Sequence, residues 1–242
     1  MARIGIIGNE GRMGHALARA IEAAGHENAG GVDRGGDVAA LADRSDTLVD
    51  FTAPSALEAN LHAAVGAGIP ILIGTTGLTD VHHALIDKAS LAIPVLQTGN
   101  TSLGVTLLAH LVKEAAARLG PEWDIEVLEM HHRMKVDAPS GTALLLGEAA
   151  AEGRGIDFHA PEGPGRYGHT GPREPGSIGF ASLRGGTVAG EHSVILAGPQ
   201  ERLTLSHSAE DRMIFAHGAV RGAVWLTGQP AGRYMMRQVL GL

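Results

Sequence analysis

The sequence contains no cysteine. Without thiols the chain can form no disulfide, no thiolate nucleophile and no cysteine-ligated zinc or iron–sulfur site. It also lacks any apolar run near the ~20 residues that a membrane-spanning helix needs, and it lacks a block of like charges. The N-terminal residues do not show the charged, apolar and small-residue pattern of a secretion signal. From these absences we expect a cytosolic protein that does not bind membranes.

The composition that remains is typical of a globular protein. Hydrophobic residues make up 44% and charged residues 19% of the 242 residues, which allows a sizeable core in one large domain or two small ones. The formal net charge is -7 with histidines neutral. Because no basic stripe offsets this charge, we expect no nucleic-acid-binding surface, and a local cluster must hold any anionic ligand.

Short apolar runs alternate with segments of helical period through the N-terminal part of the chain. This alternation predicts a parallel sheet covered by helices. Right-handed crossovers make such a sheet open and doubly wound, with a ligand crevice beyond the carboxyl ends of its strands. The strand-like runs are "RIGIIG", "NAGGVD", "TLVDFT", "IPILIGT" and "IPVLQTGN".

The pattern changes after Thr101. A long helical stretch and the strand-like "WDIEVLEMHH" are followed by a loop rich in glycine and proline at 161–176. The next three segments alternate like antiparallel strands joined by glycine-containing turns; they are "SIGFASLRGG", "TVAGEHSVILAG" and "ERLTLSHSA". We therefore predict a first domain at 1–102 and 212–242, and at 103–211 a second α+β domain with a mixed or antiparallel sheet.

Glycines 8, 11 and 14 stand where the first predicted strand ends and a helix begins. Gly8 and Gly11 let the backbone turn tightly and approach a pyrophosphate, whereas Gly14 allows close packing of helix on strand. The helix start adds free N–H groups. Asp33, at the end of the second predicted strand, can bond the adenosine ribose. The glycine spacing alone would also suit a structural turn, but the combination predicts a Rossmann-like nucleotide site.

Two neighbouring residues bear on the choice of nucleotide. The carboxylate of Asp33 repels a ribose 2′-phosphate, whereas the guanidinium of Arg34 can clamp one. We predict that both NADH and NADPH are used, with NADH preferred. We interpret Glu10 as an exposed loop residue, while Arg12 either reaches the phosphate or nicotinamide or is simply exposed.

Two further strand ends fall on the same rim, at 74–77 ("GTTG") and 98–102 ("TGNTS"). Their small, hydrogen-bonding residues leave room for a nicotinamide ring. A structural turn before a helix explains each segment equally well.

The stretch 129–150, "EMHHRMKVDAPSGTALLLGEAA", gathers histidines and cations just before a predicted helix. His131 and His132 are adjacent on a strand and so point to opposite faces, which disfavours a shared metal ion. The segment also lacks the G-x-S-x-G elbow of a serine hydrolase. Ser140 is a good N-cap, and the following Gly141 and Thr142 can form a nest for a carboxylate.

Lys135, with His131 or His132, could add opposing charge and a transferable proton to that nest. The alternative is an ordinary capped helix preceded by a polar loop.

Taken together, these motifs resemble the dihydrodipicolinate reductase family, also called 4-hydroxy-tetrahydrodipicolinate reductase, of bacterial lysine biosynthesis. The resemblance spans nearly the whole chain in order, and its most specific part is the H-H-R-x-K-x-D-A-P-S-G-T run. The matching segments are "GNEGRMG", "VDFTAPS", "IGTTG", "HHRMKVDAPSGTA", "GHTGPREPGSIGFASLRGGTVAGEH" and "MRQVLGL".

The resemblance implies reduction by NADH or NADPH of a cyclic, unsaturated, nitrogen-containing dicarboxylate, with loss of water to give tetrahydrodipicolinate. It implies a homotetramer assembled through the sheet of the second domain. It assigns proton donation to His131 and Lys135, and substrate contacts to His132, Gly141 and Thr142; we add Ser140 to the predicted substrate contacts because it caps the same helix start. The residues that match the family's cofactor contacts are Gly8, Asn9, Glu10, Gly11, Arg12, Met13, Asp33, Arg34, Gly74, Thr75, Thr76, Thr98, Gly99, Asn100 and Thr101.

The chain departs from the family at two places. Thr101 stands where the family commonly has phenylalanine, and the segment between Asp33 and Thr47 is shorter than usual. Three other interpretations remain: a related reductase for a different substrate, a nucleotide- or carboxylate-binding regulator without activity, and a scaffold. The H-H-R-x-K run speaks against the first, and turnover of NADH distinguishes an enzyme from a regulator.

Overall fold

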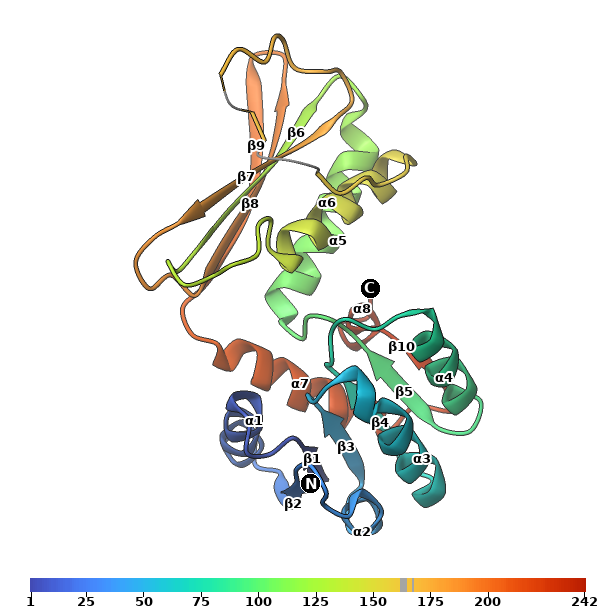
Figure 1. Ribbon diagram of the computed structural model, residues 1–242. Coiled ribbons are helices and arrows are strands. Elements are labelled where there is room, and N and C mark those ends of the chain that lie inside the picture. Colours follow the sequence, from blue (N-terminus) through green and yellow to red (C-terminus); the bar gives the residue numbers. More distant parts are fainter. Residues whose placement is uncertain (162–164, 167) are drawn as a thin grey trace. The chain divides into compact units, whose positions relative to one another are not determined.

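The computed structural model describes residues 1–161, 165–166 and 168–242. Four residues of the loop at 161–176 lie outside the described residues. The chain divides into two compact units (Figure 1). The first unit comprises Met1–Leu103 and Met213–Leu242, and the second comprises Gly104–Arg212.

The first unit contains a six-stranded sheet whose neighbouring strands are all parallel, in the order β10-β5-β4-β3-β1-β2. The predicted doubly wound parallel sheet is thereby confirmed. Its strands are β1 (Arg3–Ile7), β2 (Glu27–Val32), β3 (Thr47–Asp50), β4 (Ile71–Ile73), β5 (Pro94–Gln97) and β10 (Gly232–Tyr234). Its helices are α1 (Arg12–Ala23), α2 (Val38–Asp43), η1 (Pro54–Ala56), α3 (Leu57–Ala67), α4 (Asp80–Ser90), α7 (Met213–Leu226) and α8 (Met236–Val239).

Successive side chains of a strand point to opposite sides of the sheet. Apolar residues at consecutive positions therefore give this sheet two apolar faces, and helices cover both of them. Ile4 and Ile6 of β1 lie in one apolar cluster with Leu17 of α1 and with α7. Ile7, the next residue along, lies in a second cluster with α2, α3 and α4. Every residue of β3 and β4 is buried, including the polar Thr47 and Asp50 of β3, because both faces are covered.

The sequence pattern did not predict β10. This strand has only three residues, Gly-Arg-Tyr, and pairs in parallel with β5. The chain reaches that edge only because α7 packs across the sheet, so a local apolar pattern gives no sign of it. The C-terminal segment thus completes the first sheet.

The second unit pairs a four-stranded sheet with two helices. The strand order is β7-β6-β8-β9, and Leu108 of α5 and Leu146 of α6 pack on Ile125 and Val127 of β6. The expected mixed sheet is confirmed. The elements are α5 (Leu103–Leu119), β6 (Asp124–His131), α6 (Gly141–Arg154), β7 (Ile178–Arg184), β8 (Gly190–Gly198) and β9 (Glu201–Ala209).

The expected antiparallel pairing of β7 with β8 is wrong. β7 lies on the other side of β6 and pairs with it in parallel, whereas β8 pairs with β6 in antiparallel fashion. The reason is the helix α6, which connects β6 to β7 and returns the chain to the end where β6 began, as crossovers between parallel strands do. Only β8 and β9 form the predicted hairpin.

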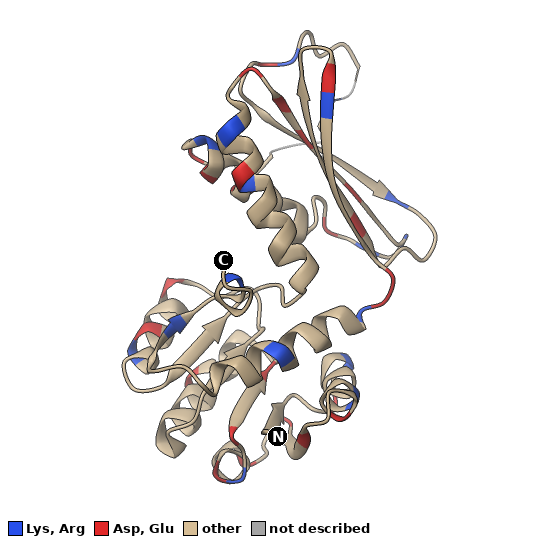
Figure 2. Cartoon of the chain, turned by 180° about the vertical axis from the view of Figure 1, so that it is seen from behind, with Lys and Arg blue, Asp and Glu red and all other residues tan. Residues whose placement is uncertain are grey.

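Charged residues of both signs are interspersed along the elements of both units (Figure 2). Among the described residues, no helix has both the length and the apolar character needed to cross a membrane.

Candidate active site

The strands of the first unit end at one edge of its sheet because they are parallel. Gly8 follows β1, Asp33 follows β2, Gly74 follows β4 and Thr98 follows β5. The sequence-predicted cofactor residues therefore share one rim, and β1 lies at its switch point, between β2 and β3, where open α/β sheets bind ligands.

The glycine loop connects β1 to α1 and packs closely against the start of that helix. Gly8 has φ +88° and donates its N–H to Val32 O at 2.8 Å. A Cβ on Gly14 would lie 2.3 Å from Gly8 O and 2.4 Å from Asn9 O, so only glycine lets α1 approach the loop. The N-cap of α1 is Gly11, which provides no side-chain cap. The helix start can accordingly direct its N–H groups at a phosphate.

Asp33 is held at the end of this loop. Its Oδ2 accepts the backbone N–H of Glu10 at 2.9 Å, and its Oδ1 accepts that of Arg34 at 3.2 Å. Glu10, Asp33 and Arg34 are exposed. The acidic side chain is thereby presented to solvent beside the glycine loop, the place where a ribose hydroxyl would be bound.

The two threonine-containing segments of this rim, 74–77 and 98–102, each contain one buried threonine. Thr75 and Thr101 are buried, at 4% and 2% exposure. The Thr101 hydroxyl donates to Phe215 O of α7 at 2.7 Å. α7 can come this close because a Cβ on Gly218 would lie 1.8 Å from Thr101 O. Thr101 thus anchors the loop to α7, and Thr76 and Gly99 remain exposed on the rim.

A buried carboxyl group that the sequence did not single out lies under the same rim. Asp50, at the end of β3, accepts hydrogen bonds from the N–H and hydroxyl of Thr52 and from the amide of Asn60. Burial raises the pKa of Asp50. Its position within the "VDFTAPS" motif was visible, but its burial was not. We assign it to holding the turn beside Gly8.

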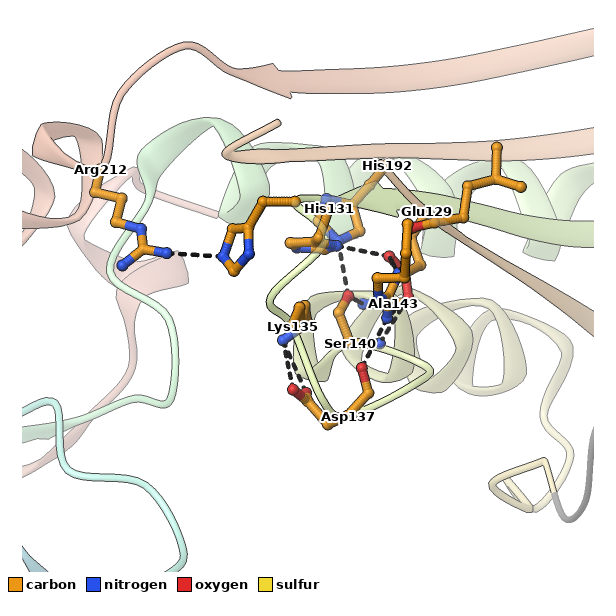
Figure 3. Close-up of polar contacts among 11 residues, drawn as sticks. Glu129, His131, Lys135, Asp137, Ser140, Ala143, His192 and Arg212 are labelled. Carbon is orange, nitrogen blue, oxygen red and sulfur yellow. Dashed lines mark hydrogen bonds and ion pairs between the residues drawn. The ribbon is translucent and has the colours of Figure 1, made fainter. Parts of the chain in front are cut away.

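In the second unit, the end of β6 carries a buried acid–histidine pair (Figure 3). Residues of β6 alternate between buried and partly exposed, and Glu129 and His131 both lie on the buried face. The Glu129 Oε2 atom is 2.6 Å from His131 Nδ1. Glu129 is 1% exposed and His131 is 8% exposed.

Two further residues donate three hydrogen bonds to the Glu129 carboxylate. Arg184 of β7 donates one N–H to each oxygen, both at 2.8 Å, and the Ser140 N–H donates to Oε1 at 3.2 Å. Burial alone raises the pKa of Glu129, but hydrogen bonds from Arg184 and His131 outweigh it and lower the pKa to about 2. The carboxylate is ionised at neutral pH.

Ser140 begins α6 as the sequence predicted for its N-cap. Its Oγ accepts the Ala143 N–H at 3.1 Å. The same Oγ lies 2.8 Å from Nε2 of His192 on β8. Burial, followed by the charge of His131, lowers the pKa of His192 to about 4, so His192 is neutral at physiological pH. The helix start is therefore connected to the Glu129–His131 pair by short, buried contacts.

The turn after β6 separates His132 and Lys135 from that pair. The His132 N–H donates to Val188 O, and its Nε2 lies 3.0 Å from the guanidinium of Arg212. Lys135 Nζ contacts both oxygens of Asp137 at 2.8 Å (Figure 3). β6 ends at His131, and the chain turns directly after it. His132 therefore lies at the start of this turn and not on the opposite face of the strand.

Sequence reasoning missed four residues of this cluster. Glu129 could have been found, because it lies two residues before His131 and so shares its strand face. Arg184, His192 and Arg212 come from β7, β8 and the segment before α7, and no local pattern connects them to β6. Among the described residues, no three His, Asp or Glu side chains are placed to hold a metal ion.

The chain is similar to known proteins over its whole length. Residues 2–101 match the family model for the N-terminus of dihydrodipicolinate reductase, and residues 104–240 match that for its C-terminus. A 4-hydroxy-tetrahydrodipicolinate reductase of Zymomonas mobilis is 53% identical over 99% of this chain and 97% of that protein. One of Acidiphilium cryptum is 51% identical over 99% and 98%, respectively.

Among solved structures, a dipicolinate-bound dihydrodipicolinate reductase from Paenisporosarcina sp. TG-14 superposes with a TM-score of 0.75. The two proteins share 22% sequence identity, and the alignment covers 97% of each chain. This likeness shows the common two-unit fold.

Proposed function

The chain belongs to the dihydrodipicolinate reductase family, and we propose that its two units divide the family's reaction between cofactor and substrate. Relatives at about 50% identity are 4-hydroxy-tetrahydrodipicolinate reductases. The chain accordingly reduces 4-hydroxy-tetrahydrodipicolinate to tetrahydrodipicolinate with loss of water, as an NAD(P)H-dependent oxidoreductase of lysine biosynthesis. The observation that carries this function is the match of both family models, which together cover nearly every residue.

The first unit binds the dinucleotide. The loop 8–13 and the start of α1 hold the pyrophosphate, and Asp33 bonds the adenosine ribose. The tight approach at Gly14 and the uncapped helix start fit this group. When bound, the nicotinamide supplies the hydride. The rims at 74–76 and 98–101 border the nicotinamide, with Thr75 and Thr101 contributing backbone groups because their side chains are buried.

The second unit binds and protonates the substrate. Hydride addition to a conjugated imine leaves an electron-rich centre that a general acid must protonate. His131 donates this proton, and Lys135, in the turn that follows β6, assists. One carboxylate of the substrate lies at the start of α6, against Ser140, Gly141 and Thr142. His132, whose imidazole contacts Arg212, contacts the substrate from the adjacent turn.

The oligomer forms through the sheet of the second unit. The face opposite α5 and α6 carries Leu128, Met130, Leu183 and Ile195, which alternate with the buried core residues of the same strands. Leu183 is 49% exposed. Partly exposed apolar side chains on a sheet face suit association with a second copy, and we propose a homotetramer that works in the cytoplasm.

Turnover of NADH tests the function directly. The loss of NADH absorbance is followed with enzymatically generated 4-hydroxy-tetrahydrodipicolinate, and then with NADPH under the same conditions. We expect turnover with both cofactors and a higher kcat/KM for NADH. A kcat/KM that strongly favours NADPH contradicts the role given to Asp33. Tight NADH binding without turnover would instead identify a regulator.

A further inference from the structure

The contact between His131 and Glu129 decides which imidazole nitrogen carries a hydrogen. An ionised carboxylate can only accept hydrogen bonds. Because Glu129 Oε2 lies 2.6 Å from Nδ1 of His131, the hydrogen belongs on Nδ1 in both the neutral and the charged imidazole. The proton that His131 exchanges is therefore the one on Nε2.

The carboxylate cannot easily turn away from His131. Arg184 binds both of its oxygens, and this bidentate geometry fixes the carboxylate plane. The Ser140 N–H adds a third hydrogen bond. With Glu129 1% exposed, water does not compete for these positions. The orientation of the His131 ring is thus set by groups from three different elements, β6, β7 and the start of α6.

Gly190, at the start of β8, lies beside Nε2 of His131. A Cβ at this position would lie 3.1 Å from the nitrogen. Because glycine has no Cβ, no side chain of residue 190 presses against Nε2. The ring of His192 approaches His131 edge-on, with centroids 5.1 Å apart. The Nε2 atom of His192 contacts Ser140, so it does not occupy Nε2 of His131.

We propose that Glu129 is a positioning residue of the reductase: it holds His131 in the Nδ1–H tautomer, directs Nε2 to the substrate and stabilises the imidazolium that donates the proton. This inference rests on the proposed role of His131 as the general acid. Arg184 acts through Glu129 by holding its carboxylate. A carboxylate that orients a histidine in this way is a general device of acid–base catalysis.

The charged and titratable groups around His131 come from every neighbouring element. Glu129 on β6 is the anion in contact with it, and Arg184 on β7 neutralises part of that anion's charge. His192 on β8 is neutral at physiological pH, and His207 lies beside it on β9. Lys135, in the turn before α6, adds a positive charge that reaches His192. Glu129 is the anion among these that contacts the His131 ring directly.

Glu129→Gln tests the proposal without changing the size of the side chain. Arg184 and the Ser140 N–H both donate to Oε1, so the amide oxygen takes that position. The amide N–H₂ then takes the Oε2 position, where it faces Nδ1 and the other N–H of Arg184. Neutral His131 then carries its hydrogen on Nε2, and the imidazolium loses its anionic partner. We expect kcat to fall about 100-fold or more, with a much smaller change in KM. The alkaline limb of the kcat–pH profile moves to lower pH, because the protonated acid is less stable.

Two further variants separate positioning from folding. Glu129→Asp keeps the charge and restores part of kcat relative to Glu129→Gln. Glu126→Gln is the matched control: it removes a carboxylate of the same strand that contacts Arg166 and Arg173 on the opposite face. This control keeps the wild-type kcat–pH profile. A purely structural role for Glu129 would lower the thermal midpoint in both Gln variants and move neither profile.

The tautomer itself is read from ¹⁵N chemical shifts of labelled histidine in the full-length protein, with His131→Gln used to assign the signal. The proposal requires Nδ1–H in the wild type and Nε2–H in Glu129→Gln. An Nε2–H tautomer in the wild type, or a kcat and pH profile unchanged in Glu129→Gln, overturns it. If the wild type shows no turnover, the proposed function fails, whereas the ¹⁵N shifts still decide the role of Glu129.

Discussion

At the scale of single residues, the roles of His131 and Lys135 are distinguished by where each side chain lies. His131 is buried beside Glu129, whereas Lys135 contacts the exposed Asp137. His131→Ala removes the general acid and should lower kcat about 10²- to 10⁴-fold while raising KM far less. Lys135→Ala removes a charge that both binds and assists, so it should worsen kcat and KM together.

Steady-state assays with varied substrate concentration measure these effects. Lys88→Ala, at an exposed position on α4, is the control for loss of a lysine. Wild-type turnover in either site variant would remove that residue from its proposed role.

A second prediction at this scale concerns acid stability. Burial lowers the pKa of His192 to about 4 in the folded protein, below its ordinary value of 6.5. Between these two values the unfolded chain binds more protons, so the contribution of His192 is fully present above 6.5 and is lost as the pH falls towards 4. The loss is on the order of 3 kcal/mol.

His192→Gln removes this titration and should flatten the decline in stability across the same pH range. Urea unfolding at the two limits measures the difference, with the exposed His62→Gln on α3 as control. An equally steep decline in His192→Gln would show that other groups cause it.

At the scale of elements, the approach of α1 to the glycine loop determines whether the nucleotide site forms. In Gly14→Ala the new methyl group would lie 2.3 Å from Gly8 O, so helix and loop must separate. Overpacking of this kind costs about 1–3 kcal/mol, and NADH affinity should fall as the N–H groups are displaced. Gly66→Ala is the matched control, because no atom lies within 4 Å of its new methyl group in α3.

That control should stabilise the protein by about 0.5–1 kcal/mol and leave NADH binding unchanged. Thermal unfolding and a fluorescence titration with NADH test both variants. Equal NADH affinity in Gly14→Ala and wild type would contradict the assignment of the loop.

At the scale of the whole molecule, the open face of the second sheet should decide the oligomeric state. Leu183→Glu places a charge on that face and should dissociate the tetramer, because burying an unpaired carboxylate is costly. Sedimentation velocity should give four times the 25.0 kDa chain mass for the wild type and less for the variant. Leu91→Glu, at an 83% exposed position in the first unit, should remain tetrameric. A monomeric wild type would refute the proposal.

Much of the first unit could be predicted from local sequence. The strands β1, β3, β4 and β5 are short and have buried, apolar centres. The alternation with helical segments was therefore visible, and the glycines at 8, 11 and 14 marked the turn. The N-cap at Ser140 was predictable for the same reason, since a cap depends on residues within one turn. The family resemblance then added the residue roles, which no local pattern contains.

The fold class, the family and the turns that need glycine could be read from the chain alone, because these depend on spacing along it. The folded structure was needed to establish that β7 pairs with β6, that β10 completes the first sheet, and that Arg184 and His192 meet Glu129 and His131. These features join residues that are tens of positions apart. Such contacts depend on how α6 and α7 pack, and that packing leaves no periodic trace in the sequence.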